Sequence, residues 1–321
     1  MKKNFLAIIT VLMLVVTLSI PSTALAESNG NLNGNNVTSF KDSDEYFGND
    51  TEYDSYVSEY DIYVGIKNSK ENNTYLSAFS ISDETVKDIL DGEVEEQLLS
   101  IKKLSNSELY KRGYDDNDIV LLRKYNGEPL EEAPYLRAVL GVIYTNITVP
   151  TKTNDVMYVR LKWWWDTLPL LRLTDTIGAS WYGNNEADLQ LLTTYDAYPT
   201  KCTVYYDNGT TANVKAADVD RNHIMYKIPM TTDEHIAYSS AAYQGVLDVS
   251  VGTRGAHNIS YYHYKSSYAH KELQLAASAG LSFITGAPSF GFSVNTGFKE
   301  VVHRHISITP GGAVVREPDD V

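Results

Sequence analysis

Cysteine is almost absent from this sequence, because Cys202 is the single cysteine in 321 residues. No disulfide can therefore form within the chain. Exported animal proteins often carry several disulfides. Together with the export signal described next, this scarcity favours a bacterial exporter.

Long hydrophobic runs are also scarce, and the one clear example lies at the start of the chain. Lys2 and Lys3 precede a mostly apolar stretch from residue 5 to residue 20, and Ala24-Leu25-Ala26 provides a site of small residues for cleavage. This is the pattern of a secretory signal peptide over residues 1–26. No later stretch reaches the roughly 18 apolar residues that a membrane helix needs. We therefore expect cleavage after Ala26, a secreted or extracellular product, and no stable membrane span.

Positive charge is in short supply, with 27 Lys and Arg against 41 Asp and Glu and a formal net charge of -14. Residues 27–132 hold 24 acids and 10 bases, whereas residues 133–321 hold 17 acids and 15 bases. An acidic surface repels phosphate backbones, so we expect no nucleic-acid partner. The change in charge predicts a boundary between two parts of the chain near residue 133.

Residues 27–60 are acidic, rich in tyrosine and poor in aliphatic side chains. Such a composition buries little apolar surface to offset the entropy lost on ordering. We therefore expect a disordered leader, which either stays solvated or docks its tyrosines on a basic partner.

Residues 61–132 carry the start and stop signals of short helices. Ser82 precedes two acids, and capping boxes occur at Ser105 to Glu108 and at Asp115 to Asp118. Glycines commonly end helices. The expected helix ends are Gly92, Gly113 and Gly127. This region is predicted to be a small helical unit.

Residues 133–310 read as about ten short strands separated by turn residues, with Asp207-Asn208-Gly209 as a hairpin signal. Because no long amphipathic helices lie between them, the strands should pair antiparallel. The predicted fold class is α+β, a small N-terminal helical unit followed by an antiparallel β-sandwich or jelly roll. Residues 311–321 are expected to form a flexible tail.

The densest aromatic feature is Trp163-Trp164-Trp165, followed by Trp181-Tyr182. On a strand, Trp163 and Trp165 point to one face and Trp164 to the other. Exposed aromatic rings suit the apolar faces of sugars. These five residues are the predicted ligand-binding residues, for a surface glycan or a protein, against the alternative that they form the core.

Two histidines, His303 and His305, share one face of a predicted strand and are the weak candidates for a metal site. No HExxH motif, third histidine at fixed spacing or cysteine pair completes such a site. Nucleophile motifs are absent too. We therefore expect no metal, no cofactor and no catalytic residues.

Four acids near the tryptophans keep a glycan-active hydrolase open as an alternative, since glycosidases use paired carboxylates. They are Asp166, Asp175, Glu186 and Asp188.

Residues 273–298 alternate apolar and small polar side chains around a Gly-Ala-Pro turn. A half-exposed hairpin of a sandwich shows this alternation, and so does the inserting hairpin of a pore-forming toxin. The leading hypothesis is an exported, non-catalytic protein that binds a surface ligand through aromatic side chains. A pore-forming or membrane-inserting toxin is the first alternative.

Overall fold

The structure is a computed structural model, and it describes only part of the chain. The described residues are 39–49, 52–68, 83–153, 156–185, 190–191, 193–195, 200–232, 240–253, 259–271, 281–283, 292–294, 298–309 and 314–315. They all belong to one compact unit, which spans Val37–Thr232 and Ser240–Val321. The predicted signal peptide, residues 1–26, lies outside the described residues.

Two antiparallel sheets form the main body of this unit. Sheet A has the strand order β1-β2-β3-β11-β7-β8, with β6 also paired to β11. Its strands are β1 (Ser55–Ser58), β2 (Val142–Thr153), β3 (Val156–Trp165), β6 (Thr193–Tyr195), β7 (Lys201–Tyr206), β8 (Thr211–Val214) and β11 (Ala242–Thr253).

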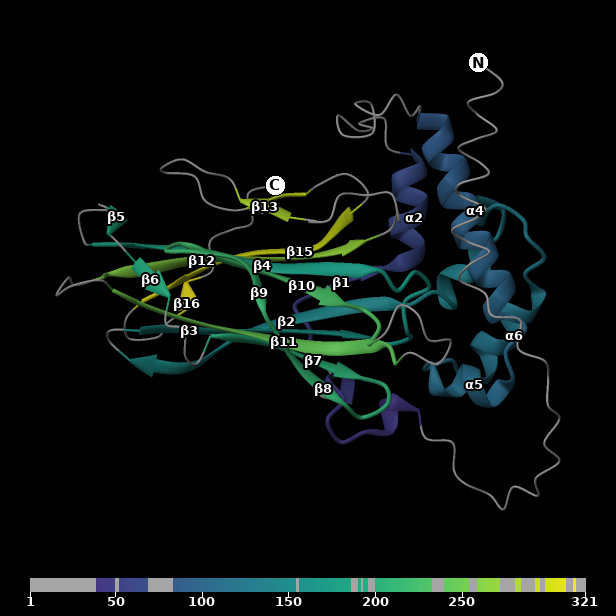
Figure 1. Ribbon diagram of the computed structural model, residues 1–321, viewed down its shortest axis with the longest axis horizontal. Coiled ribbons are helices and arrows are strands. Elements are labelled where there is room, and N and C mark those ends of the chain that lie inside the picture. The colour runs from purple at the N-terminus through teal and green to yellow at the C-terminus, as the bar shows by residue number, and fades with distance from the viewer. Residues whose placement is uncertain are drawn as a thin grey trace. The chain divides into compact units, whose positions relative to one another are not determined.

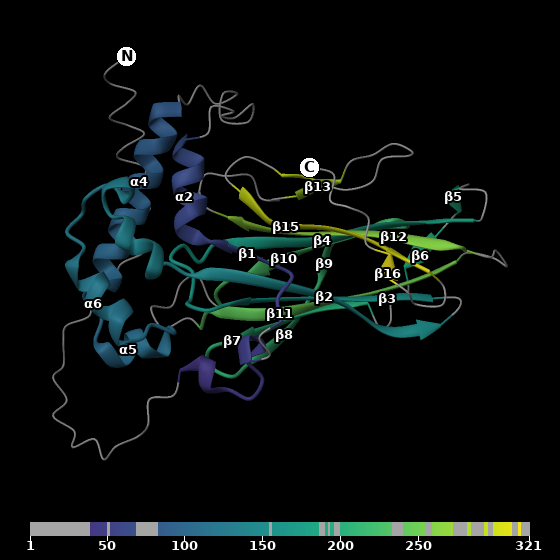
Figure 2. The same cartoon turned by 180° about the vertical axis from the view of Figure 1, so that it is seen from behind.

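Sheet B has the order β16-β15-β12-β4-β10-β9, with β5 also paired to β4. Its strands are β4 (Thr174–Asn184), β5 (Gln190–Leu191), β9 (Ala216–Asp220), β10 (His223–Pro229), β12 (Tyr261–Lys271), β15 (Phe298–Ile308) and β16 (Val314–Val315). Figures 1 and 2 show β4, β12 and β15 lying over β2, β3 and β11. The predicted α+β class with an antiparallel sandwich is confirmed.

The core between the sheets follows the period-two alternation of the strands. β3 alternates half-buried and buried residues along most of its length. The inward side chains of β3, β4 and β12 all join one apolar cluster with those of β7, β10 and β11. Sandwiches pack in this way because alternate residues of each strand meet the opposite sheet.

Strand β4 was not predicted from the sequence, although it lies at the centre of sheet B. Its middle is Gly178-Ala179-Ser180, residues of low strand propensity. Pairing on both sides, with β10 and β12, holds it in the sheet. Tertiary pairing therefore overrides a weak local signal.

The helices are α2 (Glu59–Asn68), α4 (Asp83–Ile101), α5 (Asn106–Lys111) and α6 (Asp116–Lys124), with 3-10 turns at Leu130–Glu132 (η3) and Pro134–Ala138 (η4). Both predicted capping boxes, at Ser105 and at Asp115, are confirmed. Gly113 and Gly127 have positive φ, as helix-terminating glycines do. The predicted stop at Gly92 is wrong, because α4 continues through it.

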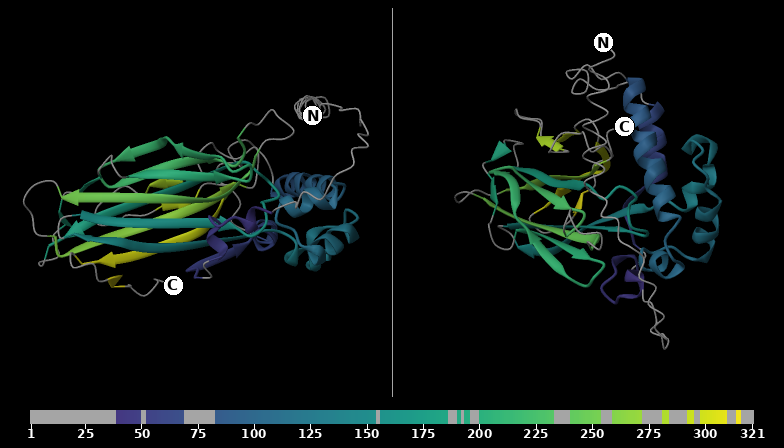
Figure 3. Two further views of the ribbon diagram at one scale, coloured as in Figure 1. Left: turned by 90° about the horizontal axis from the view of Figure 1, so that it is seen from below. Right: turned by 45° about the vertical axis from the view of Figure 1, so that its right-hand side comes forward.

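The prediction of a disordered leader over 27–60 is wrong for its described part. Two 3-10 turns, η1 (Phe40–Asp42) and η2 (Phe47–Asn49), precede β1, which pairs with β2. Phe40 and Tyr46 are buried against Trp164 and Tyr243. Figure 3 shows this purple segment against the strands. The aromatic rings supply the apolar surface that aliphatic residues do not.

The flexible tail is also corrected in its described part. Val314 and Val315 form β16 and pair with Ile308 and Ser307 of β15. This short stretch therefore extends the edge of sheet B.

The predicted boundary near residue 133 falls inside a packed cluster. Ala133 is buried in the helical cluster, which continues to Leu140 and takes in Leu170 and Leu171 from the loop after β3. On the other side, Ile62 of α2 belongs to the core of the sandwich. The two parts therefore share side chains across the predicted boundary.

A fragment that starts at Ala133 is expected to lack a cooperative thermal transition. It loses β1, the segment from Phe40 to Tyr46, and α2. Each fully buried large apolar side chain contributes about 1.5–3 kcal/mol, and a whole domain has a net stability of only about 5–15 kcal/mol. Circular dichroism melts of 133–321 and of a control fragment, 39–321, measure the difference. Equal melting temperatures would show that the sandwich folds independently.

Candidate functional site

The four tryptophans predicted to bind a ligand are buried. Trp163, Trp165 and Trp181 have no exposed surface, and Trp164 is 3% exposed. Trp163 and Trp165 do share one face of β3, as predicted, and this face is the core between the sheets. Stacking on a sugar needs an open ring face, so these indoles do not form the platform. The core interpretation, which the sequence left open, holds for Trp163, Trp165 and Trp181, and Trp164 is buried on the other face of β3 in a cluster with Phe40 and Tyr46.

Tyr182, the fifth predicted residue, is half-buried on β4. Its ring stacks on His263 of the neighbouring strand β12, with centroids 4.4 Å apart and an interplanar angle of 15°. It belongs to a packed pair within sheet B.

An aromatic surface does exist, and other residues form it. We call Tyr53, Tyr56 and Tyr144 the tyrosine patch. Tyr53 and Tyr56 are 49% and 59% exposed. The centroid of the Tyr53 ring lies 5.5 Å from that of Tyr56 and 5.0 Å from that of Tyr144, and the Tyr56 and Tyr144 centroids are 6.0 Å apart. The three rings make one continuous surface.

The strand register of sheet A explains why these rings meet. Tyr56 of β1 pairs with Tyr144 of β2, and Tyr144 pairs with Trp164 of β3. Directly opposite residues of an antiparallel pair project on the same face. The row therefore lies on the face of sheet A opposite the core, where the Tyr144 ring stacks on Trp164 at 5.7 Å and 13°.

The folded N-terminal segment covers one end of this row and leaves the other open. The backbone N–H of Phe47 donates to the side-chain oxygen of Gln244 at 2.9 Å, and the Gln244 amide donates to the carbonyl of Glu45 at 2.7 Å. Trp164 lies beneath this segment, in a cluster with Phe40 and Tyr46. The tyrosine patch is the part of the row that remains accessible.

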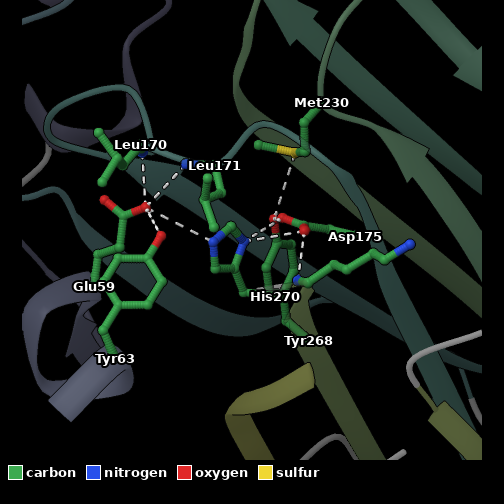
Figure 4. A network of polar contacts seen from close by, with 9 residues as sticks. Glu59, Tyr63, Leu170, Leu171, Asp175, Met230, Tyr268 and His270 are labelled. Carbon is green, nitrogen blue, oxygen red and sulfur yellow. Dashed lines mark hydrogen bonds and ion pairs between the residues drawn. The ribbon is translucent and has the colours of Figure 1, made fainter. Parts of the chain in front are cut away.

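A second feature is a cluster of ionisable groups with no exposure at all. Glu59 begins α2, Asp175 lies on β4 and His270 lies on β12, and each is fully buried. We call these three residues the buried ionisable cluster. Figure 4 shows the imidazole of His270 between the two carboxylates. Nδ1 of His270 is 3.0 Å from both oxygens of Asp175, and Nε2 is 3.9 Å from Oε1 of Glu59.

Each carboxylate also accepts hydrogen bonds from outside the cluster. Oε1 of Glu59 accepts from the hydroxyl of Tyr63 at 2.6 Å and from the backbone N–H of Leu170 at 2.7 Å. Asp175 accepts from the hydroxyl of Tyr268 at 2.5 Å and from the N–H of Lys271 at 2.9 Å. Oε2 of Glu59 has no hydrogen-bond partner among the described residues.

Burial controls the acidity of these groups. Loss of solvation raises the pKa of Glu59 above its ordinary value, and nearby His270 and the bond from Tyr63 oppose this rise. Burial, followed by the charge of Asp175, raises the pKa of Tyr268 well above its ordinary value. None of the three side chains of the cluster is exposed to solvent in the structure.

Of the four acids proposed for a hydrolase, the structure describes Asp166 and Asp175, and each is hydrogen-bonded within the protein. Asp175 is enclosed in the buried ionisable cluster. Asp166 accepts from the N–H of Val142 at 2.7 Å, and burial raises its pKa to about 6. Glu186 and Asp188 lie outside the described residues.

The weak metal candidates His303 and His305 lie on β15, opposite Ser267 and Lys265 of β12. Their side chains are outside the described part of the structure. Among the described residues, no group of three or more His, Cys, Asp or Glu has the arrangement of a metal site.

Only short parts of the predicted 273–298 hairpin are described. β13 (Leu281–Phe283) pairs antiparallel with β14 (Phe292–Val294), in the register expected of a hairpin. The rest lies outside the described residues. Within the described residues, no helix has the length and apolar character to cross a membrane.

One open cavity of about 440 Å³ runs along α4 and is lined by residues of that helix, including Glu95 and Leu99, and by Lys103 just after it. It contains no residue of the tyrosine patch or of the buried ionisable cluster.

Sequence reasoning missed both features for identifiable reasons. Tyr53 and Tyr56 fall within the predicted disordered leader, and the short β-prone run Tyr56-Val57 is the local signal for the strand that forms there. Asp175 was weighed only as a glycosidase acid. His270 and Glu59 had no local signal, because 111 residues separate Glu59 from its partner Leu170, and 95 separate Asp175 from His270.

Comparison with known proteins gives no family assignment. No protein-family profile matches the chain, and no curated protein matches it. Among solved structures, one described as "AvmM Catalyzes Macrocyclization in Alchivemycin A Biosynthesis" is similar over 56% of this chain and 91% of its own, with 8% identity and a TM-score of 0.26. A likeness at this level carries no conclusion about function.

Proposed function

We propose that this is an exported, non-catalytic bacterial protein that binds a surface glycan through the tyrosine patch. The signal-peptide pattern of residues 1–26 and the lack of a possible disulfide support export from a bacterium. The tyrosine patch carries the binding part of the proposal. Two of its rings expose about half or more of their surface, which is unusual for large aromatic side chains without a partner.

The backbone beneath the patch is well fixed. The N–H of Asp54 donates to the carbonyl of Thr145 at 2.7 Å, and the carboxylate of Asp54 accepts from the N–H of Ile147 at 2.6 Å. Oγ of Ser55 lies 3.0 Å from Oγ1 of Thr145. A platform fixed in this way loses little entropy when a ligand binds.

The chemistry of the patch suits a neutral sugar chain. Tyrosine rings offer flat apolar faces, and their hydroxyls form hydrogen bonds with sugar hydroxyls. The neighbouring Glu52 is exposed and adds an acceptor. The acidic surroundings disfavour strongly anionic polymers.

The double variant Tyr53→Ala/Tyr56→Ala is expected to weaken glycan binding at least about fivefold. Each lost aromatic contact removes about 0.5–1.5 kcal/mol, and about 1.4 kcal/mol corresponds to a tenfold change in Kd. Binding to bacterial cell-wall polysaccharide is measured by sedimentation with the insoluble polymer and by calorimetry with soluble fragments.

The matched control is Tyr261→Ala, which removes an exposed tyrosine, 40% accessible, from β12 of sheet B. This control should bind like the unaltered protein, and all variants should melt at similar temperatures. Unchanged binding by the double variant, or equal loss in the control, would rule out the tyrosine patch as the glycan site.

A further inference from the structure

The buried ionisable cluster joins parts of the chain that are distant in sequence. Glu59 stands at the joint where β1 becomes α2, and its N–H donates to the carbonyl of Gly141 at 2.8 Å. Its carboxylate contacts the loop after β3 through Leu170, and it faces His270 on β12. One side chain therefore connects the helices to both the loop and sheet B.

The charge of this cluster depends on a single proton. Asp175 accepts hydrogen bonds from the hydroxyl of Tyr268 and from the backbone N–H of Lys271. With Nδ1–H of His270 donated to Asp175, the other ring nitrogen faces Glu59. If neither Nε2 nor Glu59 carried a proton, two carboxylates and a neutral imidazole would be buried together, and an uncompensated buried charge is strongly unfavourable.

We propose that Glu59 and His270 hold one proton between them, and that this proton fastens the start of α2 to the sandwich, so that the joint loosens as the pH rises. The structure thus contains a proton-dependent latch in addition to its binding surface. The latch holds in acidic surroundings and weakens in alkaline ones.

The surrounding groups agree with this direction. Tyr63 on α2 donates to Glu59, and Tyr114, after α5, lies within its electrostatic reach and has a raised pKa, mainly because of burial. The Trp165 ring packs edge-on against His270, with centroids 5.1 Å apart. Arg112 and Arg172 lie within electrostatic reach of Tyr114 and oppose the rise of its pKa.

The sign of the effect follows from the raised pKa of Glu59. Because the folded protein holds this proton more tightly than the unfolded chain, the stabilisation is complete below the ordinary pKa of a carboxyl group. It is lost as the pH rises through the folded value. Burial also raises the pKa of Asp166, to about 6, so its effect on stability has the same direction. It therefore contributes to the pH dependence of the global free energy of unfolding.

The test is hydrogen exchange of the full mature protein between about pH 5 and about pH 9, corrected for the intrinsic exchange rates. Amides at the start of α2 and in the loop 168–171 should open up to about tenfold more for each pH unit between the ordinary pKa of a carboxyl group and the raised pKa of Glu59, and should level off above it. In Glu59→Gln this dependence should disappear, because the amide still accepts from Tyr63 and Leu170 but cannot ionise.

Two controls separate the latch from other titrations. Asp61→Asn changes an exposed carboxylate on the same helix, which pairs with Arg137, and should keep the dependence. Asp166→Asn should reduce the pH dependence of global stability and leave that of the α2 amides in place.

If Glu59→Gln does not fold, the proposal is tested on the unaltered protein. The two measurements are the hydrogen exchange of its α2 amides and the ¹⁵N resonances of the His270 ring. The ring should carry a proton at Nδ1 throughout and change at Nε2 as the α2 amides open. The proposal is overturned if the corrected hydrogen exchange of the α2 amides does not vary with pH. It is also overturned if this exchange has the same pH dependence in Glu59→Gln as in Asp61→Asn.

Discussion

Asp175→Ala is expected to lower the free energy of unfolding by about 3–5 kcal/mol, the usual cost of removing one partner from a buried charged pair. The substitution leaves the imidazole of His270, the hydroxyl of Tyr268 and the N–H of Lys271 without their common acceptor. His270 has no solvent access, so water does not replace the lost acceptor. Urea unfolding followed by circular dichroism measures the loss.

Asp220→Ala is the matched control, since Asp220 is an exposed aspartate on β9 whose side chain accepts, within the described part of the chain, a hydrogen bond from the neighbouring Arg221 N–H. Its effect should stay within about 0.5 kcal/mol, as for most surface substitutions. The double variant Asp175→Leu/His270→Phe should cost less than the sum of its single changes, because no buried charge is left between these positions. Removing an exposed, solvated carboxylate costs about 1 kcal/mol or less. If Asp175→Ala lowered the free energy of unfolding by no more than this, Asp175 would not be the buried acceptor that His270 and Tyr268 depend on.

Gly245→Val is expected to lower the free energy of unfolding by about 3 kcal/mol, at the upper end of the usual cost of overpacking. Gly245 of β11 lies directly opposite Trp163 of β3. A Cβ at this position would be 2.6 Å from Cζ2 of the indole, well inside van der Waals contact. Trp163 is fully buried and cannot swing aside. Urea unfolding again provides the measurement.

Gly92→Ala provides the opposite control, because nothing lies within 4 Å of the Cβ it would add. Alanine in a helix interior is favoured over glycine by about 0.5–1 kcal/mol, so this variant should be more stable. Combining Gly245→Ala with Trp163→Phe should recover part of the stability lost in Gly245→Ala, since the smaller ring leaves room. If Gly245→Val were as stable as the unaltered protein, the indole would not occupy the space above the glycine.

Local chemistry in the sequence was enough to identify several elements. The capping boxes at Ser105 and Asp115 depend on side chains three residues apart, so they could be predicted without the fold. Period-two geometry placed Trp163 and Trp165 on one face of β3 and Trp164 on the other. The absence of long helices between the strands predicted an antiparallel sandwich, and the structure has one.

Packing over long sequence distances decided the rest. The sequence showed three adjacent tryptophans, but only the opposing sheet and the segment from Phe40 to Tyr46 determined that all of them are covered. In the same way, pairing with β2 places part of the acidic stretch in β1, the strand that carries Tyr56. In both cases the stabilising contacts lie with partners that composition cannot identify.

The two candidate sites show the same division. Antiparallel register alone makes Tyr56 and Tyr144 neighbours, and it brings Asp175 and His270 together across β4 and β12. Residue types and spacings in the sequence determined the capped helices and many of the strands, because those depend on interactions within a few residues, whereas β1 and β4 needed their pairing partners. Only the tertiary structure decided which rings remain exposed and which carboxylates face a histidine, because strand order and burial are properties of the whole packed unit.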